Sequence, residues 1–113
     1  MTNRRAQGSE HEDRAADYLL SEGYTIVTRR FKAGGGEIDI VAMDGDVLVF
    51  VEVKFRQRGA PETAVGYTKV QRFNDAVGVY LQKTGSHKSL VRYDLIAVTP
   101  TELRHHKGAF GSR

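Results

Sequence analysis

The chain has 113 residues, 40% of them hydrophobic, which predicts one domain spanning residues 1–113 and able to bury a core without covalent cross-links. It contains no cysteine, so disulfides and thiolate metal sites are excluded, and a reducing cytoplasm is the expected location. The longest apolar run covers only residues 47–51, which is far too short to span a bilayer, so we expect no membrane partner.

The first predicted element is a helix over about residues 9–22. Glu12 falls on its apolar stripe by helical spacing, which turns an acid toward the core side. A second interpretation remains open, in which Ser9 and Glu12 form a capping box and Glu12 reaches back to the start of the helix. The apolar stripe consists of Ala15, Ala16 and Leu19.

Three strands, a second helix and a last strand are predicted after the first helix. Period-2 apolar patterns indicate the strands, and a stripe at helical spacing indicates the helix, with Thr68 and Gln71 as its capping box. These elements cover about residues 24–31, 37–43, 47–55, 69–83 and 90–98. Because the second helix connects the third and last strands, we expect these two strands to lie side by side. The order αβββαβ predicts an α/β fold with a central mixed sheet flanked by helices.

The most informative stretch is the apparent hairpin of residues 37–55, whose two apolar runs are separated by an Asp-Gly-Asp turn signal. A two-residue loop places Asp39 opposite Phe50, whereas a four-residue loop places it opposite Glu52. With either loop, Asp39, Glu52 and Lys54 share one face of the sheet. A three-residue loop without a bulge would instead put Asp39 and Glu52 on opposite faces.

Two carboxylates that converge beside a lysine have two interpretations. They can form an oxygen-rich site for Mg²⁺, which holds a phosphate oxygen and lowers the pKa of a bound water, while Lys54 orients that water or stabilises the developing charge. The implied reaction is phosphodiester hydrolysis. Alternatively, the three residues form a structural ion-pair cluster at a sheet edge. The spacing fits both interpretations.

The hairpin sequence GEIDIVAMDGDVLVFVEVKFR, residues 36–56, resembles the active-site hairpin of the PD-(D/E)XK nuclease superfamily, which has the restriction-endonuclease-like fold. The whole chain is similar to the YraN-like bacterial family, described as predicted endonucleases distantly related to Holliday-junction resolvases. Arg30 departs from the family pattern, because an asparagine is common at this position. The other matching segments are GSEHEDRAADYL (8–19), GYTIVTRRF (23–31), Lys69 with the helix after it, RYDLIAV (92–98) and GAF (108–110).

The resemblance implies a metal-dependent endonuclease that uses Mg²⁺ or Mn²⁺ to hydrolyse phosphodiester bonds, with branched or damaged DNA among the expected substrates. It makes Asp39 and Glu52 metal ligands, Lys54 the catalytic lysine, and Glu12 a helical acid that completes the site. The alternative function is a non-cleaving nucleic-acid-binding protein that keeps the nuclease fold and acts with a protein partner. Cleavage of junctions would require two coordinated cuts and hence a homodimer. Substrate contacts are assigned to Arg30, Arg56, Lys69 and Glu37.

Basic residues are clustered near these segments, and the pI of about 9.3 at a net charge of +3 favours a polyanionic partner. Each cluster taken alone also fits a solvated surface. The clusters are Arg4-Arg5, Arg29-Arg30 with Lys32, Arg56 with Arg58, and residues 104–107.

Among the aromatic residues, Phe31, Tyr67 and Tyr80 are candidates to stack on bases, with core packing as the alternative. His105 and His106 would point to opposite sides of an extended chain, so we do not expect them to chelate a metal together.

Overall fold

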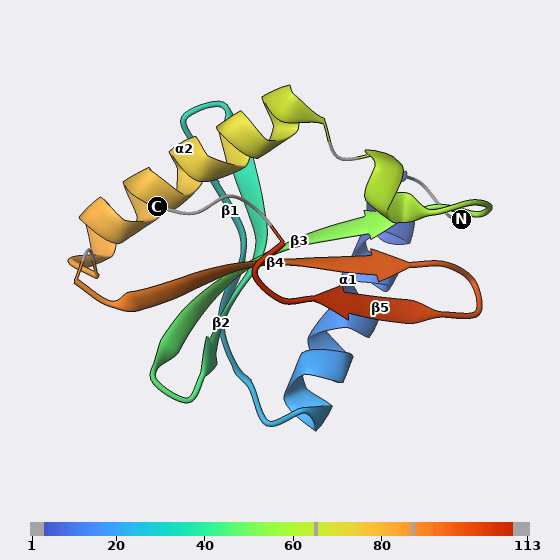
Figure 1. Cartoon of the computed structure of the whole chain (residues 1–113), viewed down its shortest axis with the longest axis horizontal. Helices are drawn as coiled ribbons and strands as arrows, with labels where there is room; N and C mark the ends of the chain where they lie inside the picture. The colour runs from blue at the N-terminus through green and yellow to red at the C-terminus, as the bar shows by residue number, and fades with distance from the viewer. Residues whose placement is uncertain (1–3, 65, 87, 110–113) are drawn as a thin grey trace.

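The computed structural model describes residues 4–64, 66–86 and 88–109, and the side chains of residues 4–9, 64 and 67 lie outside that description. Its centre is a five-stranded sheet in the order β1-β2-β3-β4-β5, with one long helix packed on each face (Figure 1). None of the described helices is long and apolar enough to cross a membrane. The elements are α1 (Arg4–Ser21), β1 (Thr25–Ala33), β2 (Gly36–Asp44), β3 (Val47–Phe55), the 3₁₀ helix η1 (Pro61–Ala64), α2 (Tyr67–Thr84), β4 (Leu90–Val98) and β5 (Leu103–His106).

The sheet is mixed, as the order of predicted elements indicates. Strands β1, β2 and β3 form an antiparallel meander. Strand β4 lies parallel to β3, and β5 pairs antiparallel with β4. Helix α2 makes the crossover that a parallel pair requires. The αβββαβ core, a mixed sheet flanked by helices, is therefore confirmed, and β5 is an additional strand at its edge.

Both predicted capping boxes are wrong. Helix α1 begins at Arg4, five residues before the expected start, so Ser9 and Glu12 lie inside the helix. The added turn is polar and carries no apolar stripe that could mark it in the sequence. The N-cap of α2 is Gly66, which has no side chain to cap with, and Thr68 already lies inside the helix.

The two helices cover two separate apolar layers, and β3 supplies both because its residues alternate between the faces. Leu48 and Phe50 belong to the layer under α2, and Val49 and Val51 to the layer under α1. Fully burying one side chain of this size contributes about 1.5–3 kcal/mol. The same alternation directs Glu52 toward the α2 side, which is where its lysine partner from α2 lies.

Two of the proposed stacking residues are part of this core. Phe31 and Tyr80 pack edge to face in the layer under α2, with ring centroids 5.2 Å apart, so core packing is the correct interpretation for both. The side chain of Tyr67, the third candidate, lies outside the described residues.

The start of β2 touches the backbone of α2 at Gly36. A Cβ atom added to this glycine would lie 2.2 Å from the carbonyl oxygen of Arg72, closer than any real contact. Only glycine fits here. This close approach positions Glu37 and the acidic end of β2 beside α2.

Asp94 on β4 is fully buried and ties the end of the described chain to the sheet. It accepts hydrogen bonds from Arg92 Nε and the Gly108 N–H, both at 3.0 Å, and lies 2.7 Å from Nε2 of His105. Burial alone would raise the pKa of Asp94, but the contacts with His105, Arg92 and Gly108 hold it below its ordinary value. His106 points the other way, to Glu62 at 2.7 Å, as expected for neighbours on an extended strand. Phe110, in the GAF segment, lies outside the described residues.

Candidate active site

The hairpin register brings together the residues next to Asp39 and Glu52. The antiparallel pairs run from Asp44 with Val47 to Ile40 with Val51, and the next step along this register is Asp39 with Glu52. This is the pairing predicted for the longer loop, although the turn itself is tight and consists of Gly45 and Asp46. Gly45 has φ of +63°, which such a turn requires.

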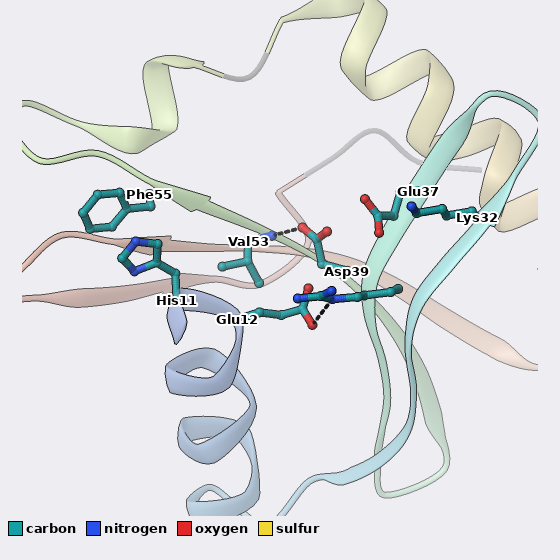
Figure 2. Close-up of a pocket in the computed structure, with 8 residues that line it drawn as sticks. His11, Glu12, Lys32, Glu37, Asp39, Val53 and Phe55 are labelled. Carbon is teal, nitrogen blue, oxygen red and sulfur yellow. Dashed lines mark hydrogen bonds and ion pairs between the residues drawn. The ribbon is translucent and has the colours of Figure 1, made fainter. Parts of the chain in front are cut away.

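Asp39 is held at the point where the hydrogen-bonded pairing of β2 with β3 ends. Its Oδ2 accepts a hydrogen bond of 2.7 Å from the Val53 N–H, drawn in Figure 2. Burial, and then the charge of Glu52, raise the pKa of Asp39 well above its ordinary 3.8, while the Val53 hydrogen bond acts in the opposite direction. The fold therefore destabilises the ionised form of this carboxylate, and a cation bound nearby would stabilise it.

Glu52 is almost completely buried, at 3% exposure, and two lysines neutralise it. Its Oε2 lies 3.6 Å from Nζ of Lys54, on the same strand, and 3.4 Å from Nζ of Lys69, on α2. Burial raises the pKa of Glu52, and the two ammonium groups oppose that rise. Burial, followed by the proximity of Lys69, lowers the pKa of Lys54. The lysine predicted for the active site thus shares its acid with a second lysine.

Glu12, at 6% exposure on α1, is engaged by two arginines from β1. Its Oε1 accepts hydrogen bonds from Arg29 Nε at 2.9 Å and Arg30 Nε at 3.2 Å. Arg29 also contacts Asp13, at 2.6 Å. The prediction that α1 turns Glu12 toward the core side agrees with this burial. Its role as a metal ligand stays a prediction, and it would require the arginines to release the carboxylate.

Arg30 adopts an unusual backbone conformation, with φ of +59°, the sole positive φ of a non-glycine residue in the described ranges. Its neighbours Arg29 and Phe31 pair with Ile40 and Ile38, so Arg30 lies across from Asp39 in the sheet. The left-handed region costs an arginine about 1–2 kcal/mol, whereas asparagine enters it more readily. An asparagine at this position would therefore adopt the same backbone conformation at a lower cost than Arg30 does.

The donor groups fit a hard divalent cation at Asp39 and Glu52. Both supply carboxylate oxygens, which Mg²⁺ and Mn²⁺ prefer, and their mutual repulsion would be relieved by positive charge. Within residues 4–64, 66–86 and 88–109, no group of three or more histidine, aspartate or glutamate side chains lies close enough together to hold a metal. The fit therefore rests on two carboxylates, with the remaining positions left to water or substrate.

Two clefts meet at Asp39. The first, which we name the Asp39 cleft, has a volume of about 660 Å³ and is shown in Figure 2. The second, of about 530 Å³, lies toward α2 and includes Glu52 and Lys69. Lys32, Glu37 and Asp39 line both. The Asp39 cleft is lined by His11, Glu12, Arg30, Lys32, Glu37, Asp39, Val53 and Phe55.

The structure adds His11 and Phe55, which sequence reasoning missed. Their rings stack face to face in the Asp39 cleft, with centroids 3.6 Å apart and an angle of 7° between the planes. His11 comes just before Glu12, and Phe55 just after Lys54, so adjacency to predicted site residues was the available signal.

The basic residues fall into two groups. Lys32 and Arg30 line the Asp39 cleft, and Arg56 and Arg58 line a neighbouring hollow of about 540 Å³ beside Lys54. By contrast, Arg104 in the run 104–107 is bound by Glu62, at 2.9 Å, and serves an internal ion pair. The side chains of Arg4 and Arg5 lie outside the described residues.

The fold is restriction-endonuclease-like. The chain superimposes on Hjc, a Holliday junction resolvase from Archaeoglobus fulgidus, with a TM-score of 0.57 and 18% sequence identity, over 88% of this chain and 76% of the other. At this level of identity the likeness concerns the fold alone.

The chain belongs to the uncharacterised protein family UPF0102, whose sequence pattern matches residues 11–98. A UPF0102 protein of Thermodesulfovibrio yellowstonii is 40% identical over 106 residues, covering 91% of this chain and 94% of its own. One from Rhodococcus jostii is 37% identical over 118 residues, covering 97% and 100%. One from Marinobacter nauticus is 41% identical over 99 residues, covering 85% and 80%. The predicted YraN-like membership is confirmed.

Proposed function

We propose that this protein is a metal-dependent endonuclease that hydrolyses phosphodiester bonds in DNA. The observation that carries the proposal is the proximity of Asp39 and Glu52, two carboxylates that line one cleft and interact closely enough for the charge of Glu52 to raise the pKa of Asp39. Lys54 and Lys69 both place their ammonium groups on Glu52, whereas the ionised form of Asp39 is destabilised, so a purely structural ion-pair cluster does not account for Asp39. The resolvase-like fold adds independent support.

In this proposal Asp39 and Glu52 hold Mg²⁺ or Mn²⁺. When bound, the ion supplies Lewis-acid activation of the scissile phosphate and of water. Lys54 stabilises the negative charge that develops on the phosphate oxygens. Lys69 keeps the buried Glu52 neutralised on the α2 side, and its half-exposed ammonium also reaches the second cleft, where a phosphate can enter.

The substrate contacts assigned from the sequence belong to the same proposal. Arg30 and Glu37 line the Asp39 cleft, and Arg56 lines the adjoining hollow beside Lys54. A strand that follows the Asp39 cleft past Asp39 and on to this hollow would run along Phe55, which lines both. Glu37 carries a negative charge, so we assign it to a sugar or base donor and not to a phosphate.

Cleavage assays test the proposal directly. Purified protein with Mn²⁺ or Mg²⁺ is incubated with branched, single-stranded, duplex and RNA substrates, beside the Lys54→Ala variant prepared identically. We expect metal-dependent cutting of DNA by the wild type and loss of at least about 100-fold in the variant, the typical effect of removing one charge-stabilising group. Equal cutting by wild type and variant would identify a contaminating nuclease. A wild-type protein that cuts none of the substrates would contradict the proposed endonuclease function.

A second candidate is a nucleic-acid-binding protein that keeps this fold without cutting. The observation that favours it is the engagement of Glu12 by Arg29 and Arg30, which withholds the third acid from a metal. Wild-type protein that binds Mn²⁺ and DNA yet leaves every substrate intact would support it. The cytoplasmic location, the single domain over residues 1–113, and a homodimer or protein partner remain predictions.

A further inference from the structure

The ring pair His11–Phe55 differs from the aromatic contacts of the core. Core aromatic pairs such as Phe31–Tyr80 and Phe50–Tyr93 meet edge to face, with centroids 5.2 and 5.9 Å apart. Such tilted arrangements are the ones that isolated aromatic side chains prefer. His11 and Phe55 instead lie parallel at 3.6 Å, the spacing at which flat rings stack in nucleic acids. This geometry presents flat ring faces rather than interlocking edges.

The pair also lies where a ligand can reach it. Both rings line the Asp39 cleft, and each is half-buried. Figure 2 shows the rings at one end of this cleft, Asp39 in the middle, and Lys32 with Glu37 at the other end. A stacking surface, a metal-binding carboxylate and a cation therefore follow one another along one cleft. A nucleotide chain offers the matching sequence of base, scissile phosphate and flanking phosphate.

We propose that the His11–Phe55 ring pair is a binding site for an unpaired nucleobase of a DNA strand whose adjoining phosphate lies at Asp39. The inference rests on the proposed function, because it assumes a DNA strand in the cleft, and it deepens that function by naming the form of DNA. Bases in an intact duplex are stacked inside the helix and cannot reach a protein ring. A base at a branch, gap or single-stranded end can. The site therefore selects DNA with unpaired nucleotides beside the cut.

Binding measured without metal tests the site separately from cleavage. A fluorescently labelled single strand and a blunt duplex of the same sequence are titrated in EDTA against wild type, His11→Ala and Phe55→Leu. The leucine keeps an apolar side chain against the α1 layer, to which Phe55 belongs. His106→Ala is the matched control, since this exposed histidine contacts Glu62 and not the cleft.

We expect both ring variants to bind the single strand about tenfold more weakly, within the range measured for one stacked base, and to bind the duplex as the wild type does. A strand with an abasic position at the stacking nucleotide should bind wild type and His11→Ala equally. Ring variants that bind the single strand as tightly as wild type would overturn the site while leaving the nuclease proposal intact.

Other outcomes separate the two proposals. Equal losses on single strand and duplex would show that the rings act through the fold, which also overturns the stacking site. If wild type binds the single strand more tightly than the ring variants do, but never cuts DNA with Mn²⁺, the nuclease proposal is overturned and the stacking site is retained. Should Phe55→Leu unfold, as judged by circular dichroism, the half-buried His11→Ala still decides the question.

Discussion

Replacing Asp39 by asparagine should stabilise the metal-free protein. Ionisation of the carboxylate is opposed by burial and then by the charge of Glu52, which raise its pKa well above 3.8. Each pKa unit of such a shift corresponds to about 1.4 kcal/mol by which the folded state disfavours the ionised form. Asparagine has the same shape, carries no charge and can still accept the hydrogen bond from Val53 N–H.

We expect a gain of about 1–2 kcal/mol in the free energy of unfolding at pH 7.5 in EDTA, allowing for the partial exposure of the side chain. For a chain of this size that corresponds to a rise of about 4–8 °C in Tm. The direction of the pKa shift of Asp39 determines how the stability of wild type depends on pH. Because the pKa of Asp39 is raised on folding, wild type loses stability as pH rises from about 4 through the folded pKa, so the gain should shrink toward pH 4.

The assay is thermal unfolding of wild type, Asp39→Asn and the control Asp46→Asn, whose aspartate lies exposed in the hairpin turn. The control should change stability by less than about 0.5 kcal/mol. Added Mn²⁺ should raise the Tm of wild type and leave that of Asp39→Asn unchanged, since only the former retains both ligands. A metal-free Asp39→Asn protein that is as stable as wild type or less stable would refute the electrostatic reasoning.

Three further outcomes follow from the same structure. Gly36→Ala should lower the free energy of unfolding, measured by chemical denaturation, by at least about 2 kcal/mol, because the added Cβ collides with the carbonyl oxygen of Arg72. The control Gly78→Ala, on the open face of α2, should raise it by up to about 1 kcal/mol. Equal stabilities of the two variants would contradict the packing. Asp94→Asn should destabilise the protein by about 1.5–3 kcal/mol at pH 7, because Arg92 keeps its ion pair with Asp44 but loses the charged partner at Asp94, and this penalty should fall as pH drops below about 4, since the pKa of Asp94 is depressed on folding; a penalty independent of pH would argue against the ion pair. Lys54→Ala should retain calorimetric Mn²⁺ binding while losing cleavage, and loss of both would assign the lysine a structural role.

Much of the fold could be predicted because its central strands are apolar on both faces. The runs that became β3 and β4 match their predicted bounds, since a strand covered by helices on both sides needs continuous hydrophobic residues. β5 escaped prediction because its four residues, Leu103–His106, are mostly charged or polar and pair only at the sheet edge. The start of α1 was missed for a similar reason, because its first residues show no apolar stripe in the sequence.

The site was predictable to the extent that it depends on strand register. Alternation alone places Asp39, Glu52 and Lys54 on one face, and the pairing of the hairpin agrees with one of the two registers considered. Contacts between distant segments were not accessible in this way. The ion pairs of Glu12 with Arg29 and Arg30, and the stack of His11 on Phe55, depend on how α1 docks against β1 and β3. One sequence carries no signal for that docking geometry.

Crystallography with Mn²⁺ shows whether Asp39 and Glu52 bind a divalent cation, because anomalous scattering locates the ion without reference to any assay of activity. We expect an anomalous peak between Asp39 and Glu52, within about 2.2 Å of a carboxylate oxygen from each. Crystals grown in excess Mn²⁺ that show no ion at these two carboxylates, or whose strongest site lies elsewhere on the protein, would contradict it.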